Sequence, residues 1–140
     1  MLYLDTSVII AALLPEDSTA RIHAWLAAQD AGSLYVSGWA LTEVSSALAI
    51  KVRTGALTPE QRAEVIAAWT NLRAASLTML PVTEAHFATA AGFIDHVDLG
   101  LRAGDALHLA VAAGAGQVMV TLDRLLATAA TALGVRMLMP

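Results

Sequence analysis

The sequence predicts an α/β fold: a single domain in which a central parallel β-sheet is flanked by helices on both faces. Short apolar runs with β-branched and aromatic residues alternate with longer Ala-rich stretches of helical period, and this alternation is typical of repeated β-α units. The 140 residues are enough to bury one core and leave no room for a second domain. We therefore expect one domain over residues 1–140.

Five of the short runs are predicted to be strands. Each combines a few apolar, β-branched or aromatic residues, which is the composition that strands favour. The longer stretches between them are predicted to be helices. In chain order the strands are Leu2–Leu4, Leu34–Ser37, Leu77–Val82, Val118–Thr121 and Val135–Met139.

Helix start and stop signals support this assignment. The Asp-Ser-Thr segment at residues 17–19 can cap a helix that runs to about Gln29, and Pro15 ends the apolar run before it. Thr58 begins a later helix, because a Pro follows it and Gln61 is placed to complete a capping box.

Composition narrows the function classes. The chain is 57% hydrophobic, but none of its apolar runs reaches the roughly 20 residues that a membrane-spanning helix needs. The first residues read as a strand rather than as a charged leader, so we expect a cytoplasmic protein. A net charge of −4 argues against a protein that holds nucleic acid through a broad basic surface. An enzyme that binds phosphate through cations avoids this objection.

Four acidic residues stand where the apolar pattern predicts strand ends or the first turns of helices. In an open parallel sheet these places share the carboxyl edge, where ligands bind. For each residue taken alone, a helix cap or a favourable contact with the helix dipole is the alternative interpretation. Taken together they predict a crevice lined by the carboxylates of Asp5, Glu43, Asp105 and Asp123.

A bound cation explains these acids better than four separate caps. Asp5 and Asp123 directly follow hydrophobic strands, and Glu43 has apolar neighbours with few cations near it in sequence. An unpaired buried carboxylate is costly, so a metal ion is the economical partner. The chain contains no Cys, and ligands that are all oxygen select Mg²⁺ or Mn²⁺ rather than Zn²⁺.

The four His residues are scattered and show no spacing typical of metal ligands. His23, His86 and His96 are interpreted as surface residues or as core residues with satisfied hydrogen bonds. The same interpretation is kept for His108, although it lies one helical turn after Asp105 and so on the same helix face.

Four segments of the chain resemble the acidic motifs of PIN-domain nucleases, in the order in which that family has them. The Asp-Thr-Ser opening and the Arg-x-x-Asp-Ala block are the distinctive pieces. The small size and the lack of an added domain are similar to VapC-type toxins, the ribonuclease half of toxin and antitoxin pairs. The segments are Leu4–Val8, Thr42–Val44, Leu101–Ala110 and Thr121–Arg124.

The resemblance implies that residues 1–140 form a PIN-like nuclease domain with an endoribonuclease activity that depends on Mg²⁺ or Mn²⁺. It implies RNA as the substrate, a homodimer, and a cognate VapB-type antitoxin as partner. The residues that it implies as catalytic and metal-binding are Asp5, Glu43, Asp105 and Asp123.

Further side chains beside these acids have open roles. Thr6, Ser7 and Thr121 resemble the hydroxyl residues that such sites place next to the acids, although the first two equally suit helix capping. Arg102 and Arg124 lie near acidic positions in the sequence. Two roles are open for them: contacts with substrate phosphate, or salt bridges with the acids.

Two other functions remain open at this point. A phosphatase-like α/β hydrolase would use Asp5 as its nucleophile. That class calls for an Asp two residues on, where the chain has Ser7, and for a Lys near the sheet edge, whereas the only Lys is Lys51. The second alternative is a PIN-like binding module without activity, which would not require all four acids.

Overall fold

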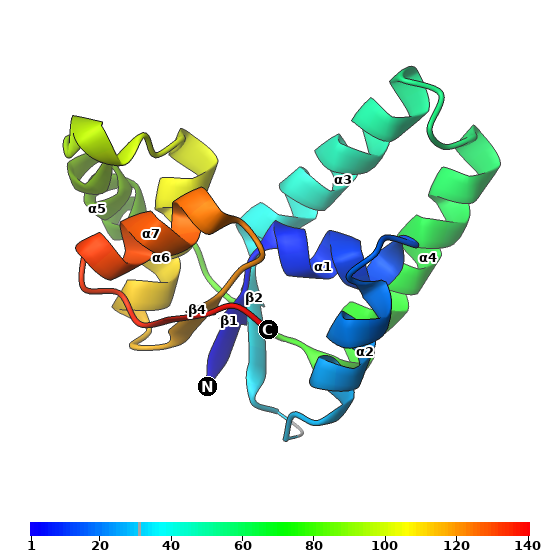
Figure 1. Cartoon of the computed structure of the whole chain (residues 1–140), viewed down its shortest axis with the longest axis horizontal. Helices are drawn as coiled ribbons and strands as arrows, with labels where there is room; N and C mark the ends of the chain where they lie inside the picture. The colour runs from blue at the N-terminus through cyan, green and yellow to red at the C-terminus, as the bar shows by residue number, and fades with distance from the viewer. Residues whose placement is uncertain (31) are drawn as a thin grey trace.

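The computed structural model describes residues 1–30 and 32–140, and it confirms an α/β fold with a parallel sheet. The sheet order is β3-β2-β1-β4-β5, and all four pairings between neighbouring strands are parallel. The chain therefore winds outward from β1 in one direction and then restarts at β4 in the other (Figure 1). The strands are β1 (Leu2–Leu4), β2 (Leu34–Ser37), β3 (Thr78–Leu80), β4 (Val118–Val120) and β5 (Met137–Leu138).

Seven α-helices occupy the intervals between strands in the described part of the chain. In Figure 1 helices α1 to α4 lie on one side of the strands and α5 to α7 on the other. The helices are α1 (Thr6–Leu13), α2 (Thr19–Ala27), α3 (Gly38–Arg53), α4 (Pro59–Ser76), α5 (Glu84–Ile94), α6 (Ala103–Gly114) and α7 (Arg124–Ala132), with a 3₁₀ turn η1 (Val97–Leu99) before α6.

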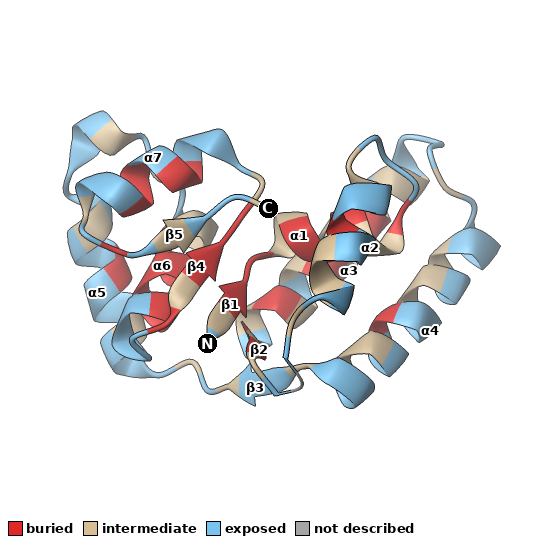
Figure 2. Cartoon of the chain, turned by 60° about the horizontal axis from the view of Figure 1, so that its bottom comes forward, coloured by how far each residue is buried: buried red, intermediate tan, exposed pale blue. Residues whose placement is uncertain are grey.

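Strand periodicity explains why both faces of the sheet are covered. Leu4 and Val120 pack into the core cluster beneath α1 to α4. Their strand neighbours Tyr3 and Met119 pack into a second cluster with residues of α6 and α7. Successive side chains of a strand point to opposite faces, so central strands that are apolar throughout require helices on both sides. Figure 2 shows burial concentrated on β1, β4 and the helix faces turned toward them.

The ends of the elements follow local chemistry. The predicted capping box of α4 is present: Thr58 Oγ1 accepts from the Gln61 N–H at 3.2 Å, and Gln61 Oε1 accepts from the Thr58 N–H at 2.8 Å. At the start of α2 the Ser18 side chain makes no cap hydrogen bond. The Thr19 hydroxyl instead donates to the Leu14 carbonyl at 2.7 Å and closes the turn before the helix.

The two edge strands are shorter than the sequence predicts. The apolar run Leu77–Val82 yields only Thr78–Leu80, and Val135–Met139 yields only Met137–Leu138. An edge strand has one neighbour, and at their C-terminal ends β3 and β5 stop level with Ser37 of β2 and Val120 of β4. Every helix in residues 1–30 and 32–140 is too short or too polar to cross a membrane.

Candidate metal centre

The four predicted acids line one pocket of about 290 Å³ at the carboxyl edge of the sheet. Asp5 directly follows β1, and Asp123 lies in the turn between β4 and α7. Because the strand order reverses between β1 and β4, this edge is the switch point where open α/β sheets bind ligands. Glu43 reaches the same pocket from α3, and Asp105 reaches it from α6.

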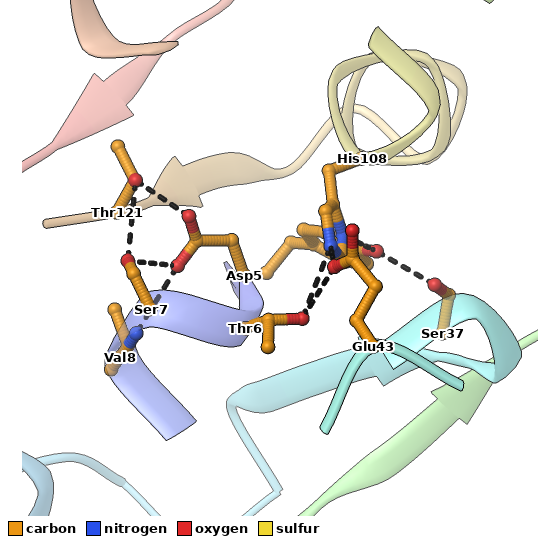
Figure 3. Close-up of polar contacts among 9 residues, drawn as sticks. Asp5, Thr6, Ser7, Val8, Ser37, Glu43, His108 and Thr121 are labelled. Carbon is orange, nitrogen blue, oxygen red and sulfur yellow. Dashed lines mark hydrogen bonds and ion pairs between the residues drawn. The ribbon is translucent and has the colours of Figure 1, made fainter. Parts of the chain in front are cut away.

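Asp5 is 4% exposed and is held by three donors. Its Oδ1 accepts from the Ser7 hydroxyl at 2.6 Å and from the Val8 N–H at 3.2 Å, and its Oδ2 accepts from the Thr121 hydroxyl at 2.6 Å (Figure 3). Asp5 is also the N-cap of α1. Burial raises the pKa of Asp5, and the bonds from Ser7, Thr121 and Val8 oppose that rise only in part.

Glu43 differs from the sequence expectation in two respects. It lies in the second turn of α3, not at a strand end or in a first turn, and it has a partner, because His108 Nε2 contacts its Oε2 at 2.5 Å. The Thr6 hydroxyl donates to the same oxygen at 2.6 Å. Burial alone would raise the pKa of Glu43, but the hydrogen bond from His108, the positive charge that His108 carries when protonated, and the Thr6 bond hold it below its usual value.

Asp105 lies in the first turn of α6. Its pKa is raised by burial first, then by the negative charges of Asp123 and Glu43. Such mutual repulsion requires the carboxylates to be close to one another. The three acids therefore form one electrostatic unit in the pocket.

Asp123 combines the two roles that the sequence left open. Its Oδ1 caps α7 by accepting from the Leu125 N–H at 2.8 Å and the Leu126 N–H at 3.1 Å. The residue also lines the acidic pocket. A helix cap and a place in the site are therefore compatible at this position.

The donor set suits a hard cation in its chemistry, although the side chains do not converge on one point. Among residues 1–30 and 32–140 no three His, Asp or Glu side chains are arranged to ligate one ion together. At least one oxygen of each of Asp5, Glu43 and Asp123 is engaged by donors of the protein. The pocket is lined by carboxylate and hydroxyl oxygens with a single imidazole, and such oxygens are the ligands that Mg²⁺ and Mn²⁺ prefer.

The sequence favoured a surface or satisfied-core interpretation for His108, and the structure places this residue in the lining of the acidic pocket. The side chain is 1% exposed and is fully hydrogen-bonded, as a satisfied core His would be. Its partner, however, is a predicted site residue. The signal in the sequence was its position one helical turn after Asp105.

The hydroxyl and arginine residues divide into two groups. Thr6, Ser7 and Thr121 each bond a carboxylate of the site. In the described structure neither Arg102 nor Arg124 forms a salt bridge with an acid. Arg124 instead lines an adjoining pocket of about 650 Å³ that shares Thr6, Ser7 and Asp123 with the acidic one.

The sequence profile of the PIN domain matches residues 2–131. The chain belongs to the PIN-domain family. No curated protein matches it significantly in sequence. Solved structures, among them a toxin and a toxin–antitoxin complex, share its fold at low sequence identity.

Three of these structures cover almost all of the chain. FitAcB from Neisseria gonorrhoeae is 22% identical, with a TM-score of 0.72, and the match covers 98% of this chain and 96% of that one. A sarcin-ricin loop cleaving VapC toxin from Mycobacterium tuberculosis is 16% identical, with a TM-score of 0.73 and coverages of 92% and 95%. VapBC-1 from nontypeable Haemophilus influenzae is 18% identical, with a TM-score of 0.67 and coverages of 99% and 97%.

Proposed function

We propose that the chain is a metal-dependent endoribonuclease and the toxin component of a toxin–antitoxin pair. The observation that carries the proposal is the meeting of four carboxylates in one pocket at the switch point of a PIN fold. A structural neighbour that cleaves the sarcin-ricin loop supports RNA as the substrate. The proposed metal ligands and catalytic residues are Asp5, Glu43, Asp105 and Asp123.

The pocket needs a cation before it can accept an RNA phosphate. Its lining carries four carboxylates and neither Lys nor Arg, so the metal-free pocket repels phosphodiesters. A bound Mg²⁺ or Mn²⁺ supplies an activated water as nucleophile and stabilises charge on the leaving oxygen. The residues around the acids keep them in place: Ser7 and Thr121 hold Asp5, and Thr6 holds Glu43.

Cleavage of a mixed RNA pool tests this function. We expect the purified chain to cut RNA with Mg²⁺ or Mn²⁺, to stop in excess EDTA, and to lose activity by orders of magnitude in Asp105→Asn, because a ligand of the ion that activates water is gone. Asp95→Asn is the matched control, since Asp95 is exposed at the end of α5, outside the pocket. Undiminished cleavage in EDTA, or RNA binding without cleavage in Mn²⁺, would contradict the proposal.

We further infer that the chain is a cytoplasmic homodimer that pairs with a VapB-type antitoxin. Large apolar side chains that are 50 to 79% exposed support a partner-covered surface. A structural neighbour that is a toxin–antitoxin complex from Klebsiella pneumoniae supports the kind of partner. Sedimentation of the lone chain at micromolar concentration should give a dimer, and a monomer would contradict this inference. The exposed side chains are Phe87, Val97 and Leu125.

A further inference from the structure

A chain of hydrogen bonds runs from β2 to the Glu43 carboxylate through the interior. Ser37 Oγ contacts the Tyr3 hydroxyl at 2.7 Å, the Tyr3 hydroxyl contacts His108 Nδ1 at 2.7 Å, and His108 Nε2 contacts Glu43 Oε2 at 2.5 Å (Figure 3). Ser37, Tyr3 and His108 are each at most 1% exposed. These hydrogen bonds link β1, β2, α3 and α6 at the wall of the acidic pocket.

The chemistry of the groups fixes the direction of these bonds. A carboxylate only accepts, so Nε2 of His108 carries a hydrogen and donates it to Glu43. In a neutral imidazole Nδ1 then accepts, so Tyr3 donates to His108 and Ser37 donates to Tyr3. Every hydrogen in the chain has an acceptor in this arrangement. The reverse order would leave the Ser37 hydrogen without one, since Ser37 Oγ has no second partner in the described residues.

The result at Glu43 is an asymmetric carboxylate. Oε2 accepts hydrogen bonds from both His108 and Thr6. Oε1 lies beside Gly104, so close that a Cβ added to this glycine would be 2.6 Å from it. The side chain is half-buried and faces the pocket. Oε2 is therefore tied to His108 and Thr6, whereas Oε1 accepts no comparable hydrogen bond from the described residues and has the Trp39 indole N–H, itself without a partner there, as a polar neighbour.

We propose that His108 is a positioning residue for the metal site: its Nε2–H holds Glu43 Oε2 so that Oε1 is presented to a divalent cation, and Tyr3 and Ser37 hold the ring in that tautomer. This inference rests on the proposed function. Groups that orient metal ligands in this way contribute about 10–100-fold to metal affinity. A His that only fills the core would contribute to stability and not to the affinity for the ion.

Mn²⁺ affinity in the absence of RNA, measured by calorimetry or by the electron paramagnetic resonance of free Mn²⁺, separates the two roles. His108→Gln keeps a side-chain N–H donor at about the reach of Nε2, whereas the shorter His108→Asn does not reach Glu43. We expect about 10–100-fold weaker Mn²⁺ binding in His108→Asn, near-parental binding in His108→Gln, and similar melting temperatures for both variants.

Two further measurements test the positioning role even if both His108 variants unfold. They are the Mn²⁺ affinity of Tyr3→Phe and the tautomer of His108 in the parent. Tyr3→Phe retains the ring and removes only the hydroxyl that holds Nδ1, so we expect a few-fold loss of Mn²⁺ affinity. Nitrogen-15 spectra of the metal-free parent should show His108 with its hydrogen on Nε2. The Nδ1–H tautomer, or His108→Asn binding Mn²⁺ as tightly as His108→Gln, would overturn the positioning role.

Asp105→Asn measured in parallel distinguishes this failure from failure of the proposed function. If Asp105→Asn weakens Mn²⁺ binding while all the His108 and Tyr3 variants bind like the parent, the metal site stands and the positioning role falls. If the parent binds no Mn²⁺, the proposed function falls, and the positioning role falls with it.

Discussion

Gly104 places the backbone of α6 beside the Glu43 carboxylate. A Cβ at this position would lie 2.6 Å from Glu43 Oε1 and 3.3 Å from Trp39 Nε1. We expect Gly104→Ala to displace the carboxylate and to lower RNA cleavage and Mn²⁺ affinity by roughly tenfold or more, as other displaced metal ligands do. The melting temperature should change by only a few degrees, because the tip of a Glu side chain can move aside.

Gly92→Ala is the matched control for this substitution. Gly92 lies in α5 with nothing within 4 Å of its Cβ position, and Ala is favoured over Gly inside a helix by about 1 kcal/mol. This variant should melt at or above the parent temperature with unchanged cleavage. Parental cleavage and Mn²⁺ affinity in Gly104→Ala would show that the position of Glu43 does not matter to the site.

Single residues differed in how far the sequence could predict them. The positions of Asp5 and Asp123 were predictable, because each lies between a strand and a helix that are adjacent to it in the sequence. The contact between Glu43 and His108 joins residues 65 positions apart, and no local pattern reports such a pair. The sequence therefore predicted Glu43 as a site residue but gave it the wrong local position and no partner.

Among the elements, α4 allows a direct test of how much the capping box at its N-terminus contributes to stability. Removing the Thr58 hydroxyl in Thr58→Ala deletes the acceptor of the Gln61 N–H, which should cost about 1 kcal/mol, or roughly 4 °C in melting temperature for a domain of this size. RNA cleavage should be unchanged, because Thr58 does not line the acidic pocket.

Thr70→Ala on the same helix provides the comparison. Its exposed hydroxyl only bonds back to the Ile66 carbonyl, and Ala is the better helix former, so the melting temperature should not fall. Equal melting temperatures for Thr58→Ala and Thr70→Ala would mean that the capping box contributes nothing measurable to α4.

Elements with strong local signals were predicted well, and edge elements were not. The central strands β1 and β2 have the bounds that their apolar runs predict. The C-terminal ends of β3 and β5 depend on how far β2 and β4 run beside them. That length is a property of the assembled sheet, so the apolar runs alone overestimated both strands.

At the scale of the whole molecule, the sheet order determines where the acidic pocket forms. The alternation of strands and helices predicted that acidic residues at the strand ends would lie together at the carboxyl edge of the sheet. It did not predict the order β3-β2-β1-β4-β5, which brings residue 5 and residue 123 to the same crevice from opposite ends of the chain. The two core clusters lie on opposite faces of the sheet, and acids from both sides meet above its edge.

An ion bound by acids from both sides should stabilise the whole domain. With Mn²⁺ at about 100 times its dissociation constant, linkage adds about 2.7 kcal/mol to the stability of the parent, which is roughly 10 °C in melting temperature for a domain of this size. Exposed acids that bind ions weakly would give almost no shift. Thermal melts with and without Mn²⁺ measure the difference.

Asp105→Asn shows whether the shift arises from the acidic pocket. Burial and the charges of Asp123 and Glu43 raise the pKa of Asp105 in the folded protein. Such a group stabilises the fold below its unfolded pKa, and this contribution is lost as the pH rises through the folded pKa. At neutral pH Asp105 therefore destabilises the metal-free fold relative to the unfolded chain, and Asn removes this cost.

The metal-free Asp105→Asn variant should then melt at or above the metal-free parent, while its Mn²⁺-induced shift should be smaller because one ligand is missing. A residue that merely favoured the helix dipole would behave in the opposite way, since its loss would lower the melting temperature and leave the Mn²⁺ shift unchanged. Four melts, of parent and variant with and without Mn²⁺, decide between these outcomes. A variant that melts below the parent and keeps the full Mn²⁺ shift would exclude Asp105 from the metal site.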